Sequence, residues 1–229
     1  FDDRIFAIAA NELNGRLATV IKKLGKRYKT AGDFGCGVGG TTSILAANFD
    51  KVIAVDYAQK LLQQAQRRVR AKNVRFVKAD LVAKKRPVVK VDVSFCINAL
   101  IHPVAKKRQR IAESVFACTK KGGKAIVVVP SLESFLRTYQ VLVECLVKQG
   151  QQRKKAIRKI SSAAKSEVHS LVEGIVDVGE TATKHYMHDE IVQLLEEVGF
   201  AVQSIDRVEF PWAEVIDHPP QWLKKPYPW

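Results

Sequence analysis

Apolar residues along this chain follow two patterns. Over residues 3–24 they are spaced three and four apart, which predicts an N-terminal amphipathic helix. Beyond it, short apolar runs rich in β-branched residues alternate with helical patterns. The strand-like runs are residues 31–34, 52–55, 74–77, 91–97, 125–129 and 201–210, and the helical patterns among the first five are 41–48, 58–71 and 104–118. This alternation predicts an α/β fold with a doubly wound, mostly parallel sheet covered by helices on both faces.

The alternation is interrupted after residue 129, where about seventy residues precede the next strand-like run. Residues 132–147 have a helical pattern, and the stretch 148–165 contains seven Lys and Arg residues without an acidic one. Residues 189–198 form a last helical pattern that ends at Gly199. We therefore expect an inserted helical cap. The tail beyond Pro211 interleaves proline with tryptophan, which predicts an irregular surface segment.

Composition indicates a folded chain and excludes several classes of protein. Apolar residues make up 47% and charged residues 27% of the 229 residues, unlike collagen, low-complexity disorder or a disulfide-stapled miniprotein. The four cysteines form no CxxC pair and have no histidine at zinc spacing, so no metal site is expected. The longest unbroken apolar run, residues 125–129, is too short to cross a bilayer, and no signal peptide is visible. We therefore expect a cytoplasmic protein without a membrane partner.

A glycine-rich loop follows the first strand-like run. Glycine is needed where a ligand approaches the backbone closely, because a Cβ would collide or forbid the turn. Gly35, Gly37 and Gly40 match the G-x-G-x-x-G dinucleotide pattern. Asp56 follows Gly35 by 21 residues, at the end of the second strand, which suits an acid that binds ribose. The glycine pattern alone is therefore compatible with a nicotinamide or flavin nucleotide and with another adenosine-bearing ligand.

Acidic residues at the ends of three strands favour a cationic ligand. Asp33 lies two residues before Gly35 and would repel a pyrophosphate seated on the loop. S-adenosylmethionine carries a sulfonium and an ammonium group and no phosphate. Asp33 would organise its amino acid end, Asp56 its ribose hydroxyls, and Asp80, at the end of the third strand, its adenine amino group. A phosphate-binding P-loop is excluded because no Lys-Ser or Lys-Thr pair follows the glycines.

Five segments occur in order and at normal spacing over residues 28–130: DFGCGVGGTT, VIAVDYA, VKADL, VDVSFCINALIH and KKGGKAIVVVP. Together they resemble the successive motifs of class I S-adenosylmethionine-dependent methyltransferases. The segment 183–186 and the Pro-Trp-rich tail resemble a group of small stand-alone members of that class. The family's sheet usually ends in an antiparallel seventh strand, yet no strand-like run follows Phe210. We therefore expect the seventh strand to be missing or truncated.

The resemblance implies a set of cofactor-binding residues at the ends of four strands. These are Gly35, Gly37 and Gly39, with Cys36 among them, at the methionine part; Asp56 and Tyr57 at ribose and adenine; Asp80 and Leu81 beside adenine; and Ile97 and Asn98 facing the methyl donor. The chain then reads as one methyltransferase domain over 1–229. Its parts are an N-terminal cap helix (1–27), a cofactor-binding core (28–130), a helical cap insertion (131–188), a last helix and strand (189–211) and the tail (212–229).

Methyl transfer from a sulfonium is an in-line displacement that requires positioning, and a base if the acceptor is protonated. His102 follows the fourth strand and is a candidate base, or a residue that caps its loop. His185 and Tyr186 precede the last helix and would contact the acceptor, or only form the helix entry. Glu133 begins the helix after the fifth strand, and we favour that structural role over proton transfer.

The formal net charge of +15 raises the question of an anionic partner. Basic clusters are expected at both edges of the sheet, and no aromatic residues interleave with the basic run, so nucleic acid is the less favoured partner. We expect methylation of a small-molecule acceptor, neutral or anionic, on O, N or S. An RNA or protein methyltransferase, a nucleotide-dependent oxidoreductase and a non-catalytic cofactor-binding protein are the alternatives. The sequence predicts no oligomeric state.

Overall fold

The computed structural model describes residues 15–84, 87, 89–178, 181–210, 212, 223 and 227–228. The first part of the expected N-terminal helix lies outside these residues, and its described part is helix α3 (Arg16–Gly25). Most of the tail over 212–229 lies outside them too. Within the described residues, no helix combines the length and the apolar character that crossing a membrane requires.

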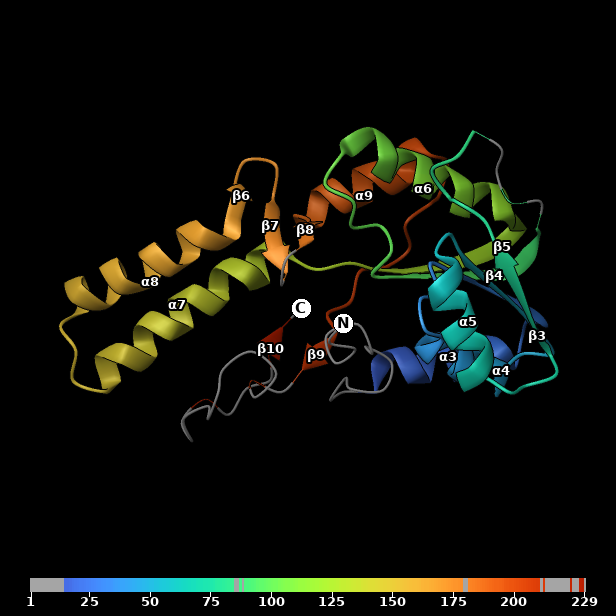
Figure 1. The fold of residues 1–229 in the computed structure, drawn as a ribbon, viewed down its shortest axis with the longest axis horizontal. Helices are drawn as coiled ribbons and strands as arrows, with labels where there is room; N and C mark the ends of the chain where they lie inside the picture. The colour runs from blue at the N-terminus through green and yellow to red at the C-terminus, as the bar shows by residue number, and fades with distance from the viewer. Residues whose placement is uncertain are drawn as a thin grey trace.

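Five parallel strands form the central sheet, in the order β3-β2-β1-β4-β5 (Figure 1). They are β1 (Thr30–Phe34), β2 (Lys51–Asp56), β3 (Val74–Lys78), β4 (Val91–Ile97) and β5 (Thr119–Val128). Strands β1, β2 and β4 are almost completely buried because they lie in the middle of the sheet with helices on both faces. The predicted α/β fold is confirmed, and the first five strand predictions fall on the observed strands.

Helices cover both faces of the sheet. On one face lie α3, α4 (Gly40–Ala46) and α5 (Gln59–Arg68), and on the other lie α6 (Ala105–Cys118) and α9 (His188–Glu197) (Figure 1). One core cluster joins Leu17 of α3 and Leu45 of α4 to the sheet, and another joins Ile111 of α6 and Ile191 of α9 to its opposite face. Both faces of the sheet are therefore covered, so the carboxyl edge is left for ligands.

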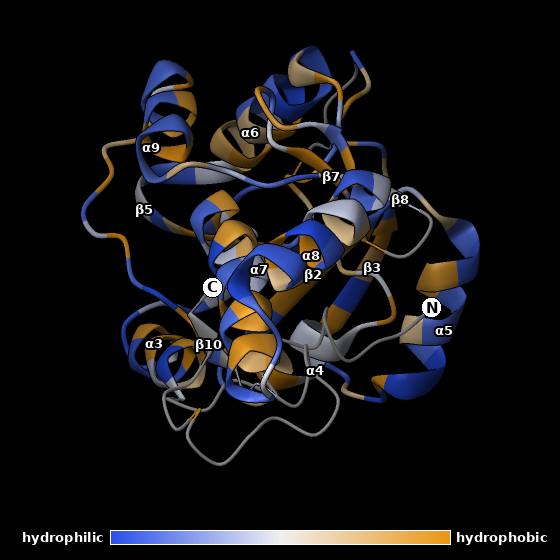
Figure 2. Cartoon of the chain, turned by 90° about the vertical axis from the view of Figure 1, so that its left-hand side faces the viewer, coloured by the Kyte–Doolittle hydropathy of each residue, from blue (hydrophilic) through white to orange (hydrophobic). Residues whose placement is uncertain are grey.

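The insertion begins at that edge with α7 (Leu132–Lys148) and α8 (Arg153–Glu167), a helix pair that projects away from the sheet (Figure 1). Helix α8 is mainly hydrophilic (Figure 2), and within it only Ala156 is buried. The chain then forms a three-stranded antiparallel sheet from β6 (Val168–Ser170), β7 (Ile175–Val178) and β8 (Thr181–Lys184). The expectation of a wholly helical insertion is wrong for residues 168–184, because strands of three or four residues are too short for periodicity to reveal.

The sixth strand predicted over residues 201–210 is the main error. Residues 201–208 form no strand, and only β9 (Glu209–Phe210) pairs, antiparallel with β10 (Tyr227–Pro228). Within the described residues this pair is separate from the five-stranded sheet. The expectation of a wholly irregular tail is therefore wrong at its end. Proline has no backbone N–H to donate, and Pro228 is tolerated here because one edge of a two-stranded pair requires no donor.

Candidate active site

The glycine loop between β1 and α4 has the backbone conformation that its sequence predicts. Gly35, Gly37 and Gly39 have φ angles of +80°, +53° and +83°, which L side chains rarely adopt. A Cβ on Gly35 would lie 2.3 Å from the Cβ of Ala99, so the loop after β4 lies directly against it. A Cβ on Gly37 would meet no atom within 4 Å. The loop therefore leaves open space at Gly37 for a ligand to approach.

Asp33 lies beneath this loop, 2% exposed, and its Oδ2 accepts a hydrogen bond from Thr42 Oγ1 at 2.5 Å. Burial is the main reason that the pKa of Asp33 rises from 3.8 to about 6; the charge of Asp56 adds to the rise, and the bond from Thr42 opposes it. A buried carboxylate with so little compensation is stabilised by a nearby cation. This is the environment that the amino acid end of S-adenosylmethionine would satisfy.

Asp56, 6% exposed at the end of β2, is joined to the loop. Its Oδ2 accepts from the backbone N of Gly37 at 2.9 Å and its Oδ1 from the backbone N of Ala58 at 2.8 Å. Each oxygen keeps a second lone pair, which a ribose hydroxyl could use. Tyr57 follows with 71% of its surface exposed. The carboxylate thus fixes the loop and the start of the next crossover together.

The next two strands contribute the remaining predicted residues. Asp80 is exposed after β3, with Oδ1 accepting from the backbone N of Val82 at 2.8 Å, and the neighbouring Leu81 is buried. Ile97, at the end of β4, is buried. Asn98 has a φ of +49°, and its side-chain Oδ1 is buried without a hydrogen-bond partner, the sole such side-chain atom among the described residues. An orphaned acceptor calls for a donor, which the ammonium group of the expected cofactor carries.

His102 caps its own loop. Its Nδ1 accepts a hydrogen bond from the backbone N of Val104 at 3.0 Å, which uses the ring's lone pair. Its pKa is lowered by burial and by the charges of Lys107 and Arg108. The structure thus favours the loop-capping interpretation of His102 over the proton-transfer one. Glu133 likewise accepts from Ser131 Oγ at 2.7 Å, as expected for the start of α7.

His185 and Tyr186 face opposite sides of one extended segment. The Tyr186 hydroxyl donates to Leu100 O at 2.7 Å, and its burial raises its pKa. His185 is 5% exposed, with its ring 5.5 Å from that of Phe135 on α7 and its Nδ1 3.4 Å from Thr183 O. Burial lowers the pKa of His185 to about 4, so the ring is neutral near pH 7.

Two functional candidates escaped the sequence analysis. Arg108, on α6, is buried, and its Nη1 donates to His102 O at 3.0 Å and to Pro103 O at 2.7 Å. Lys184 is 2% exposed, and its Nζ lies 2.6 Å from the carboxylate of Glu190. Both residues look like ordinary surface cations in the sequence. No pattern could have distinguished them, because their burial arises from elements that are distant in the chain.

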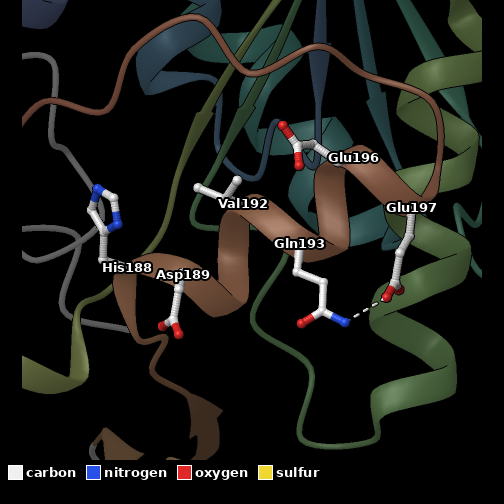
Figure 3. Close-up of a pocket in the computed structure, with 6 residues that line it drawn as sticks. All are labelled: His188, Asp189, Val192, Gln193, Glu196 and Glu197. Carbon is white, nitrogen blue, oxygen red and sulfur yellow. Dashed lines mark hydrogen bonds between the residues drawn. The ribbon is translucent and has the colours of Figure 1, made fainter.

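A hollow of about 490 Å³ lies along α9 (Figure 3), and no residue of the glycine loop lines it. It is lined by His188, Asp189, Val192, Gln193, Glu196 and Glu197. None of these is a predicted site residue, and Gln193 Nε2 already donates to Glu197 Oε1 at 2.7 Å. Across the described residues no group of three metal-ligating side chains occurs. The chemistry of the site is therefore carried by the sheet edge.

Comparison with known proteins shows what this domain is similar to. Residues 32–123 match the model of a family described as a methyltransferase domain. Malonyl-[acyl-carrier protein] O-methyltransferase 2 of Coxiella burnetii is 28% identical over 137 residues, which cover 59% of this chain and 54% of that protein. The chain thus matches about half the length of this relative.

Solved structures share the fold. An S-adenosylmethionine-dependent methyltransferase from Methanosarcina mazei superposes with a TM-score of 0.59 at 17% identity, covering 80% of this chain and 84% of that one. The PH0226 protein of Pyrococcus horikoshii gives 0.57 at 18% identity, over 79% and 77% of the two chains. The predicted fold of a class I S-adenosylmethionine-dependent methyltransferase is confirmed by these structures, and residues 32–123 resemble a methyltransferase domain as the sequence motifs predict. The roles of individual site residues stay predictions.

Proposed function

We propose that this chain transfers a methyl group from S-adenosylmethionine to a small-molecule acceptor on O, N or S, leaving S-adenosylhomocysteine. The observation that carries the proposal is the carboxylate of Asp56 bound to the backbone N of Gly37, at 2.9 Å, beside the buried carboxylate of Asp33. This edge offers two anionic groups and an open glycine backbone, which suits a cationic adenosine ligand better than a diphosphate. The methyltransferase family match supports it.

The protein's contribution to this reaction is binding and orientation. When bound, S-adenosylmethionine supplies a methyl group activated by its sulfonium. Asp33 holds the ammonium end by charge, and Asp56 holds the ribose hydroxyls through its remaining lone pairs. Asn98 Oδ1 takes a hydrogen bond that the protein itself leaves unmade. These residues lie at the carboxyl ends of β1, β2 and β4, where the cofactor would bind.

His185 is the residue we assign as the proton acceptor for acceptors that are protonated at neutral pH. Its low pKa, about 4, keeps it neutral, and assigning the ring hydrogen to Nδ1, toward Thr183 O, leaves the Nε2 lone pair available. His102 and Tyr186, by contrast, use their polar atoms on Val104 N and Leu100 O. The backbone N of Tyr186 binds Pro130 O at 2.9 Å, which holds His185 at the end of β5.

The decisive experiment is an acceptor screen with methyl-labelled S-adenosylmethionine, including hydroxyl, amine, thiol and carboxylate compounds and a malonyl-loaded carrier protein. The last is included because the Coxiella relative is named for that acceptor. Label should appear in one small-molecule or carrier-bound product. His185→Ala should lower turnover about a hundredfold or more, whereas His169→Ala, an exposed histidine paired with Asp177, should not. Calorimetric binding of NADH rather than S-adenosylhomocysteine would refute the proposal.

An RNA acceptor is the second candidate, favoured by helix α8. Its six Lys and Arg residues are all exposed on the projecting helix: Arg153, Lys154, Lys155, Arg158, Lys159 and Lys165. Cations displayed in this way neutralise phosphates, so binding to single-stranded RNA would weaken steeply with salt. Label found in RNA, together with such salt dependence, would replace the small-molecule acceptor by RNA.

A further inference from the structure

The loop after β4 carries the least ordinary backbone of the site. Asn98 is the single described residue other than glycine with a positive φ, +49°. Its backbone N is held by Val128 O at 2.9 Å, and the next residue, Ala99, fills the space that a Cβ on Gly35 would need. The loop is not part of a helix or strand up to α6. Something other than secondary structure must therefore fix it.

Four consecutive carbonyl groups of this loop accept hydrogen bonds from outside it. Leu100 O accepts from the Tyr186 hydroxyl at 2.7 Å, Ile101 O from Lys184 N at 2.9 Å, and His102 O and Pro103 O from Arg108 Nη1 at 3.0 and 2.7 Å. All three donor residues are buried. A loop with four consecutive carbonyls bound in this way has few alternative conformations, because each alternative would leave a buried polar group unpaired.

The donors are themselves held in place. Tyr186 is clamped to the end of β5, since its N donates to Pro130 O and its O accepts from Leu132 N, both at 2.9 Å. Lys184 Nζ donates to Glu173 O at 2.7 Å and to the Glu190 carboxylate at 2.6 Å, and it lies 5.0 Å from the centre of the Tyr186 ring. The insertion therefore returns to the sheet through a rigid segment that joins the ends of β4 and β5.

We propose that Tyr186 and Arg108 are positioning residues for the cofactor site. They hold the loop at residues 100–103 so that Asn98 keeps its left-handed backbone and presents its unpartnered side-chain oxygen to the methyl donor. Neither residue contacts the cofactor in this proposal; both act through Asn98. The inference rests on the cofactor site of the proposed function. It adds to that site the two residues that hold the loop after β4 in place.

Calorimetry with S-adenosylhomocysteine, which retains the ammonium group, tests this on the full chain without knowledge of the acceptor. Tyr186→Phe removes only the hydroxyl and should weaken binding about tenfold, as should Asn98→Ala. In the double variant the loss should not exceed that of Asn98→Ala alone, because the hydroxyl acts through Asn98. Tyr139→Phe, which removes a hydroxyl bound to Glu167 on the projecting helices, is the matched control and should bind normally.

Unchanged affinity of Tyr186→Phe, or additive losses of about a hundredfold in the double variant, would overturn the positioning role. If Tyr186→Phe does not fold, Arg108→Gln takes its place, and Arg108→Lys should restore part of the affinity. Hydrogen exchange at residues 98–102 should be faster in Tyr186→Phe than in the control. A wild-type chain that fails to bind S-adenosylhomocysteine would instead refute the proposed function itself, so the two failures are distinguishable.

Discussion

Because the carboxylate of Asp33 is buried, we predict that its ionisation at neutral pH destabilises the folded state of the unliganded protein. Its pKa rises from 3.8 to about 6 on folding, chiefly through burial. At 1.36 kcal/mol for each pKa unit, ionised Asp33 costs the folded state about 3 kcal/mol. Because the folded pKa is the higher one, this cost is absent below about pH 4 and develops as the pH rises through about 6. Stability should therefore fall over that window.

Asp33→Asn removes the cost while retaining an acceptor for the hydroxyl of Thr42. The unfolding free energy of the unliganded variant should exceed that of the wild type by about 1 to 3 kcal/mol at pH 7, since the new amide N–H groups offset part of the gain. At pH 4 the difference should be under about 1 kcal/mol. Affinity for S-adenosylhomocysteine should fall, because its ammonium loses a buried carboxylate.

Chemical denaturation at the two pH values is the assay, with Asp50→Asn as control, since Asp50 is exposed beside Lys29 at 4.0 Å. The control should leave stability unchanged at both pH values. The reasoning fails if Asp33→Asn is no more stable than the wild type at pH 7, or if its gain is the same at pH 4 and pH 7. Either result would show that the carboxylate is not penalised by its burial.

Four further predictions concern the same edge. Gly37→Ala should lower stability by only about 1 kcal/mol, the cost of its left-handed backbone, yet weaken cofactor binding more than tenfold. Gly39→Ala should destabilise by about 2 to 3 kcal/mol in denaturant titration, because its Cβ would lie 3.1 Å from the Cβ of Ala65. Asp56→Ala should weaken the binding of S-adenosylhomocysteine by about 1 to 3 kcal/mol in calorimetry. An unchanged affinity would show that Asp56 does not bind the ribose. If neutral His185 accepts the proton, turnover should rise with pH through about 4 and be level above about 6. A pH profile of turnover with its midpoint near 7 would exclude His185 as the proton acceptor.

Local patterns in the sequence were sufficient for the sheet and the glycine loop. Each strand from β1 to β5 contains a short run rich in apolar residues. The positive φ angles of Gly35, Gly37 and Gly39 follow from residues adjacent in the chain. The expected place of Asp33 and Asp56 at one edge needed only the rule that parallel strands align their carboxyl ends. These features depend on neighbours within a few residues, so one sequence determines them.

Other features depended on contacts between distant segments. The strand expected over 201–210 failed because an apolar run becomes a strand only where a sheet edge accepts it, and residues 201–208 have no such partner. Burial, too, is a property of packing: it made Lys184 an interior cation and His185 a neutral ring. The sequence alone determined the sheet and the loop, and it predicts the class of cofactor. Only the tertiary structure decided which polar side chains are free to act, because hydrogen-bond partners 86 residues apart, such as Tyr186 and Leu100, meet only in the folded chain.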